Sequence, residues 1–173
     1  GFLMAATGLG ALAGALRLAS RRTVVGLGRM LVLAATIFGT GLIAIGLSRW
    51  LVISLPLMAV TGFGMMIQIA GSNTLLQTIV DDDKRGRVMS LYTMSFMGMT
   101  PFGSLLAGVL ADHIGAGGTL IVGGVCCLAA AAWFALRLPR VRALVRPVYL
   151  RLGIIPEIDS DMQSTTANAQ QVD

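Results

Sequence analysis

Charged residues divide this chain into five long apolar runs. Stretches without Lys, Arg, Asp, Glu or His cover residues 1–16, 30–48, 50–80, 88–111 and 114–136. Runs of about 18 or more apolar residues are typical of transmembrane helices, because helices satisfy their own backbone polar groups in lipid. The pattern therefore predicts an all-α membrane bundle over residues 1–137, with five spans at about 1–19, 29–48, 51–79, 87–111 and 118–137.

The composition supports membrane residence and narrows the chemistry. The chain is 55% hydrophobic and 12% charged, with a mean hydropathy of +0.82, whereas an ordinary soluble domain is about 25% charged. The net charge of +5 comes from basic residues that flank apolar runs, so we expect a lipid bilayer as partner and no nucleic acid. The adjacent Cys126 and Cys127 fit neither a disulfide framework nor zinc spacing. We expect no metal, no cofactor and no catalytic residue, and hence no enzyme.

The basic residues also predict an orientation. The first, third and last connections hold four, three and five of them, whereas the second holds only Arg49 and the fourth holds none. The positive-inside rule places the richer side in the cytoplasm, so we expect a cytoplasmic C-terminus. The twelve residues on that side are Arg17, Arg21, Arg22, Arg29, Lys84, Arg85, Arg87, Arg137, Arg140, Arg142, Arg146 and Arg151.

Two further segments are predicted after the spans. Pro139 is expected to end the fifth span. In residues 138–156 the apolar residues fall within one helical arc and the basic residues outside it, which is the pattern of an amphipathic helix on an anionic membrane surface. Residues 157–173 are acidic, polar and without periodicity. We expect this tail to be disordered.

Small residues predict close helix packing at four positions. Gly10 and Gly14 form a small-xxx-small face in the first span, and Gly103 and Gly108 allow neighbours to approach the fourth. The first pair lies in a formal match to a dinucleotide fingerprint, but that fingerprint requires a preceding strand. Packing is the favoured interpretation.

The third and fourth spans hold the candidate substrate pathway. Gln68 and Ser72 share one helical face, and amides in lipid normally find partners between helices or line a watery cavity. In the fourth span Tyr92, Phe96 and Met99 lie on one stripe, near an expected break at Pro101. Two interpretations stay open for Gln68: interhelical hydrogen bonding and substrate contact.

One region resembles a known transporter superfamily. Asn73-Thr74-Leu75-Leu76-Gln77, then Asp81-Asp82-Asp83-Lys84-Arg85-Gly86-Arg87-Val88, and later Pro101-Phe102-Gly103-Ser104 resemble the major facilitator superfamily. The closest resemblance is to its branch of enterobactin-type siderophore exporters and macrolide efflux proteins, where an Arg-Gly-Arg-Val turn joins helices ten and eleven. The resemblance implies that the five spans are helices eight to twelve.

The resemblance also implies a function. It implies the C-terminal part of a secondary active exporter of amphipathic small molecules, such as siderophores, macrolides or other drugs, in a bacterial inner membrane. The partner would be the missing N-terminal half of the same protein, and we expect the chain to be the tail of a longer one. Asp83, Arg85, Gly86 and Arg87 would form a cytoplasmic latch, with Gly86 at a tight turn, although simple positive-inside anchoring explains the arginines equally well.

A non-transporting alternative stays open. A membrane scaffold or sensor would act through the basic segment and the acidic tail, and deletion of residues 138–173 distinguishes it from an exporter. The spans themselves contain no carboxylate. Any proton coupling would therefore use residues outside them.

Overall fold

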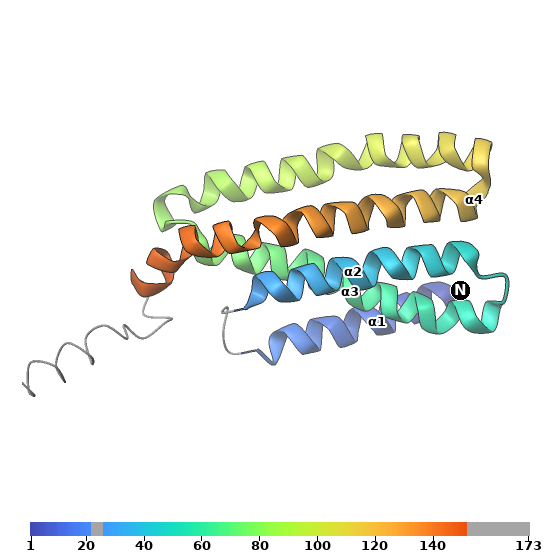
Figure 1. The fold of residues 1–173 in the computed structure, drawn as a ribbon, viewed down its shortest axis with the longest axis horizontal. Helices are drawn as coiled ribbons and strands as arrows, with labels where there is room; N and C mark the ends of the chain where they lie inside the picture. Colours follow the sequence, from blue (N-terminus) through green and yellow to red (C-terminus); the bar gives the residue numbers. More distant parts are fainter. Residues whose placement is uncertain (22–25, 152–173) are drawn as a thin grey trace, which may run out of the picture. The chain divides into compact units, whose positions relative to one another are not determined.

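The described part of the chain is entirely helical. The computed structural model describes residues 1–21 and 26–151, in which four helices follow one another (Figure 1): α1 (Phe2–Ala19), α2 (Leu27–Leu47), α3 (Leu51–Ile79) and α4 (Asp82–Arg151). The predicted all-α membrane bundle is confirmed, with four helices rather than five. Arg22 and the predicted tail 157–173 lie outside the described residues, as does the end of the predicted surface segment 138–156.

Helix α4 contains both the fourth and the fifth predicted spans. Its 70 residues would extend about 105 Å as one straight helix, whereas the hydrocarbon core is about 30 Å thick. Gly115 interrupts it with φ 75° and ψ 164°, a backbone region that is essentially restricted to glycine. The ribbon reverses at this kink (Figure 1). We call residues 82–114 the first limb and 116–151 the second limb.

Proline does not end or break these helices. Pro101 and Pro139 both lie inside α4, where Gly115 is the residue with non-helical dihedral angles, and Pro56 lies inside α3. The expected break at Pro101 and the expected helix end at Pro139 are therefore wrong. A membrane helix tolerates proline where its neighbours and local adjustments satisfy the freed carbonyl.

Helices α1 and α3 pack backbone against backbone. A Cβ at Gly10 would collide with the carbonyl of Ala59, and one at Gly62 would collide with the carbonyl of Thr7. Gly14 repeats the arrangement one turn on, since its Cβ would lie 2.8 Å from the carbonyl oxygen of Phe63. Glycine is required here because two helices in lipid associate through van der Waals contact and not through a hydrophobic driving force.

Helix α2 packs on α3 and on the second limb of α4. A Cβ at Gly64 would lie 2.9 Å from the carbonyl oxygen of Ala34 in α2. Towards the second limb, Gly39 faces Gly124 and Gly46 faces Gly117, with Cβ-to-carbonyl distances of 2.6–3.0 Å. The two pairs are seven residues apart in each helix and run in opposite directions, which defines an antiparallel pairing with a heptad-like repeat.

The buried core is small and most large apolar side chains face outward. The chain divides by its contacts into two compact units, Gly1–Leu138 and Pro139–Asp173, and the helix packing lies within the first. Large apolar side chains remain exposed on every helix of that unit, as is typical of membrane-spanning segments. The buried apolar residues are Leu27, Leu31, Ala34, Ile67, Ala131 and Leu138.

Candidate functional site

An apolar cavity lies among α2, α3 and both limbs of α4. Its volume is about 590 Å³, within the range of about 300–1,000 Å³ that is usual for small-molecule sites. Aromatic rings from three segments contribute: Phe38 from α2, Phe96 from the first limb, and Trp133 and Phe134 from the second. The remaining lining residues are Leu31, Val32, Ala35, Met65, Gln68, Ile69, Cys127, Ala130 and Ala131.

Gln68 supplies the polar feature of this cavity. Its side-chain oxygen Oε1 is buried and accepts no hydrogen bond from any described residue. A buried acceptor without a donor costs about 1–3 kcal/mol. Gln68 is thus an unsatisfied acceptor in otherwise apolar surroundings.

A second, more open hollow lies on the first limb of α4. It has a volume of about 480 Å³ and is lined by Tyr92, Ser95, Phe96, Met99 and Thr100, which recur at helical spacing on one face. The rings of Tyr92 and Phe96 stack with centroids 6.4 Å apart and an interplanar angle of 21°. Phe96 lines both hollows, so its ring lies between them.

The structure groups the predicted pathway residues in two sets. Tyr92, Phe96 and Met99 share the open hollow, and Gln68 and Phe96 share the cavity. Ser72 lines neither hollow, and its hydroxyl donates to the backbone carbonyl of Gln68 at 2.6 Å.

Hydroxyl and amide groups of α3 bond within their own helix. Thr61 donates to the carbonyl of Leu57 at 2.7 Å, and Gln77 Nε2 donates to Asn73 Oδ1 at 2.7 Å. The interhelical hydrogen bonds considered for these polar residues are absent among the described residues. On a helix, the polar groups of the residue four positions earlier lie within hydrogen-bonding reach of a side chain, so these bonds form without a second helix.

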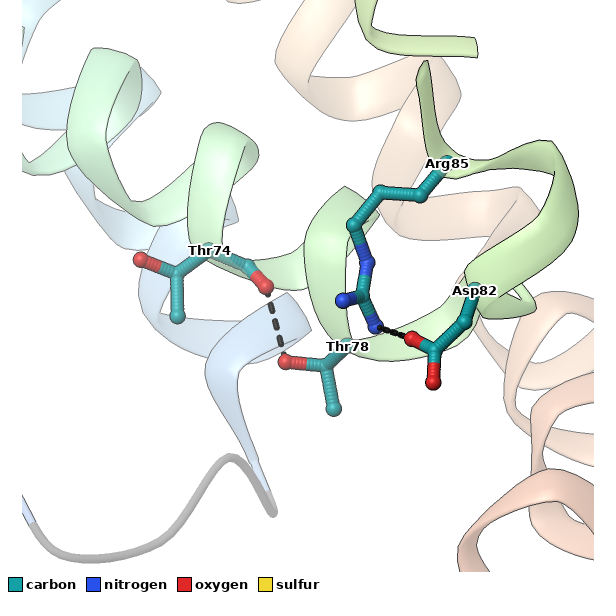
Figure 2. Close-up of polar contacts among 4 residues, drawn as sticks. All are labelled: Thr74, Thr78, Asp82 and Arg85. Carbon is teal, nitrogen blue, oxygen red and sulfur yellow. Dashed lines mark hydrogen bonds and ion pairs between the residues drawn. The ribbon is translucent and has the colours of Figure 1, made fainter. Parts of the chain in front are cut away.

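The predicted latch lies in the first two turns of α4. The chain turns at Val80 and Asp81, before the helix begins at Asp82, so the tight turn expected at Gly86 is wrong and Gly86 is helical. Arg85 pairs with Asp82 at 2.6 Å (Figure 2), and not with Asp83. Acidic residues at a helix N-terminus favour helix formation through the macrodipole, which explains why the helix starts ahead of the arginines.

Figure 2 also shows how α3 ends beside this segment. Thr78 donates to the carbonyl of Thr74 at 2.8 Å, one turn before the helix terminus. Both interactions in the figure are local, three or four residues apart. Arg87 and Asp83 make no ion pair with a described residue.

The four predicted packing glycines have different surroundings. Gly10 and Gly14 lie against α3, as described above. A Cβ at Gly103 or Gly108 would meet nothing within 4 Å among the described residues. The first limb therefore presents these small residues on an open face.

Sequence reasoning missed the contribution of the second limb. None of the predicted pathway residues came from the span 118–137, yet Cys127, Trp133 and Phe134 line the cavity. The signal was present in the spacing: 127, 130, 131 and 134 follow the i, i+3, i+4, i+7 pattern of a single helix face. Only the positions of α2, α3 and the first limb show that this face lines a cavity.

The described helices and hollows define a class of protein. Four helices are long and apolar enough to cross a membrane, over Phe2–Ala19, Leu27–Leu47, Leu51–Ile79 and Asp82–Val141, and neither hollow contains a carboxylate. This is a polytopic helical membrane protein.

The particular family follows from comparison with known sequences. Residues 1–152 match the family model described as "Transmembrane secretion effector", and the chain belongs to this family of the major facilitator superfamily. Membership supports membrane transport as its general function. No curated protein and no solved structure matches the chain.

Proposed function

We propose that the chain forms one wall of a secondary active exporter of amphipathic small molecules, which works by alternating access. The observation that carries the proposal is the open hollow on the first limb of α4. Tyr92, Phe96 and Met99 offer an aromatic and thioether surface that adapts to apolar ligands of different shapes. Siderophores, macrolides and other drugs are the substrate classes that the resemblance to the exporter branch implies.

A second helical bundle would complete the site. In alternating-access transporters two bundles rock around a binding site between them near the bilayer midplane. The first limb carries exposed apolar side chains and unpartnered glycines on its open face. We assign this face to the interface with the N-terminal half of the same protein.

The energy coupling is assigned outside these helices. The carboxylates of the described residues are Asp81, Asp82 and Asp83 at one end of α4 and Asp112 beside its kink. None of them lines either hollow. In a proton-coupled exporter the proton-carrying group would therefore belong to the other half.

The basic residues give the proposed location. Their distribution fits a bacterial inner membrane with the C-terminus in the cytoplasm. Maleimide labelling of a cysteine placed after residue 160, in intact and in permeabilised cells, tests this orientation. Labelling in intact cells by a membrane-impermeant reagent would reverse it.

Substrate protection of Phe96 tests the site. In the full-length protein with Cys126 and Cys127 replaced by Ser, we expect erythromycin or a catecholate siderophore to slow maleimide labelling of the Phe96→Cys variant about tenfold. Phe102→Cys is the matched control, because Phe102 is also exposed on the same limb, at 69% against 55% for Phe96, but lines neither hollow. Equal labelling of both variants with and without every compound would refute the assignment.

Removal of residues 138–173 separates export from the scaffold alternative. This segment is the second compact unit, Pro139–Asp173, together with Leu138, which is buried in the first unit. The truncated protein must therefore also elute as a monodisperse peak in size-exclusion chromatography. An exporter should retain more than about half of its efflux from everted vesicles. A protein that acts through its tail should lose its function entirely.

A further inference from the structure

Three arginines gather where α1 ends and α2 begins. Arg17 lies in the last turn of α1, Arg29 lies in the first turn of α2, and Arg21 follows α1. The Arg21 guanidinium reaches α2, where its Nη1 donates to the Met30 sulfur at 3.1 Å and its Nη2 lies 3.9 Å from the position of a Cβ on Gly26. Residues three apart are neighbours on a helix surface, so the Arg29 side chain starts close to the Arg21 guanidinium. We call Arg17, Arg21 and Arg29 the basic junction.

The basic junction has no ion-pair partner among the described residues. Residues 1–80 contain no Asp or Glu, and the ion pairs of the described chain lie at the start of α4 instead. Arg17 and Arg29 are exposed. Each arginine presents five N–H donors in a planar fork that fits phosphate oxygens. The junction can therefore bind an anion from outside the chain.

Exposed leucines continue from the basic junction into the two spans. Leu16, beside Arg17, and Leu33, one turn after Arg29, are each 63% exposed. Both leucines lie in helices long and apolar enough to cross a membrane. Phosphate-binding groups at the ends of two spans, with an apolar surface next to them, fit an amphiphile. A phospholipid satisfies both features, whereas a soluble phosphate satisfies only the first.

We infer that the basic junction binds the headgroup phosphate of an anionic phospholipid such as phosphatidylglycerol, with the acyl chains against Leu16 and Leu33. The lipid would come from the leaflet on the side of the membrane that is rich in basic residues, which is the side proposed to face the cytoplasm. Basic pockets between membrane helices on that side are typical sites for anionic headgroups. This site lies beyond the proposed export function, since it requires neither flux nor a second bundle.

A specific site differs from general attraction to the positive side of the membrane. Every arginine on that side attracts anionic lipid through the surface potential, and this attraction depends on the total charge. Binding at a specific site depends instead on which arginines are present. Removal of two charges at the junction, compared with removal of two charges elsewhere on the same side, separates the two cases.

Native mass spectrometry of the full-length protein in detergent measures the binding. Dioleoylphosphatidylglycerol is titrated, and dioleoylphosphatidylcholine, which has the same acyl chains and no net charge, is the matched lipid. We expect about a hundredfold tighter binding of the first phosphatidylglycerol, because each of three arginines contributes about fivefold. Arg17→Gln combined with Arg29→Gln should weaken phosphatidylglycerol binding about thirtyfold. Arg21 stays unchanged in this variant because it contacts α2.

The matched control removes two arginines outside the junction. Arg87→Gln combined with Arg137→Gln should weaken phosphatidylglycerol binding by less than about twofold, because charges beyond a Debye length are largely screened. Equal weakening in the two double variants would overturn the inference and leave general attraction. Equal binding of the two lipids by the parent would overturn it without any variant. Displacement of the lipid by millimolar inorganic phosphate would also overturn it, since the ligand would then be a soluble anion.

Discussion

Helix α1 and the first limb of α4 share a pattern of small residues but have different surroundings. Both are apolar helices with glycines at short intervals. In α1, Gly10 and Gly14 lie directly against the backbone of α3, whereas Gly98, Gly103 and Gly108 in the first limb have no neighbour within 4 Å among the described residues. A small-residue pattern thus marks a surface for close approach without indicating whether the approaching helix belongs to the same bundle.

This difference separates structural from functional surfaces. The glycines of α1 hold together the bundle itself. The glycines of the first limb belong to the same helical segment as the hollow lined by Tyr92, Phe96 and Met99. A second bundle and a substrate are proposed to lie against this segment. Substitutions in the two regions should therefore affect different properties.

The largest effect is expected at the contact between α1 and α3. Gly10→Leu should prevent folding of the bundle, because the added side chain would overlap the Ala59 carbonyl and a backbone group cannot be repacked as a side chain can. We expect less than about a tenth of the parental yield of monodisperse protein in size-exclusion chromatography.

Gly103→Leu is the counterpart on the first limb. With open space around it, the substitution should leave the free energy of unfolding unchanged or raise it by up to about 1 kcal/mol, because leucine favours a helix more than glycine does. It should nevertheless reduce efflux if a second bundle approaches this face. Parental efflux together with parental stability would leave the first limb without an interface role.

The next largest effect is expected at the kink between the limbs. Gly115→Ala should destabilise the protein by about 1–3 kcal/mol, because alanine is strained at φ 75° and ψ 164°. Gly123→Ala, at a helical position with open space around it, should be neutral or stabilise by up to about 1 kcal/mol. Urea unfolding in mild detergent measures both, and equal effects would show that the Gly115 conformation is not required.

A smaller effect is expected at the buried hydroxyl of α3. Thr61 is 6% exposed and lies against Gly41 of α2, but its hydroxyl bonds to its own helix. Thr61→Val keeps the shape and should cost about 0.5–1.5 kcal/mol, the usual net value of one hydrogen bond. Exposed Thr36→Val in α2 is the control, and a loss above about 3 kcal/mol at Thr61 would indicate an interhelical role for the hydroxyl.

The smallest effect is expected at the latch. Arg85 and Asp82 form an exposed ion pair, with side chains 46% and 87% exposed, and such pairs contribute about 0–1 kcal/mol. Arg85→Ala should leave the unfolding midpoint almost unchanged in 0.5 M NaCl. Arg87→Ala serves as comparison. A defect in efflux with Arg85→Ala alone, at parental stability, would support a latch and not simple anchoring.

The sequence predicts the helices well because charged residues are excluded from lipid, so each membrane span can be recognised as an uncharged run along the chain. It places the α2–α3 turn at Ser48–Trp50, where the structure also has it. The kink at Gly115 was expected as a longer loop, because hydropathy cannot show that one glycine suffices to reverse the chain. The break expected at Pro101 and the helix end expected at Pro139 are wrong, because the free-energy cost of a proline in a helix depends on how its neighbours satisfy the freed carbonyl. Hydropathy does not show this.

The site is less predictable than the fold because it depends on packing. Gln68 and Ser72 share a helical face, yet only Gln68 lines the cavity, while the Ser72 hydroxyl bonds to its own helix. Phe96 was identified from its stripe, but its position between two hollows depends on the second limb. The residue pattern of one helix does not predict a cavity that four segments line together.

The back-bonded hydroxyls of these helices bear on how the protein is made. Thr7, Thr36, Thr40, Thr61, Thr74 and Thr100 all donate to carbonyls of their own helix, so these polar groups need no neighbour. Each segment can leave the translocation channel for the bilayer before its partners are synthesised. The glycine contacts can form afterwards, when assembly joins helices that were already stable alone.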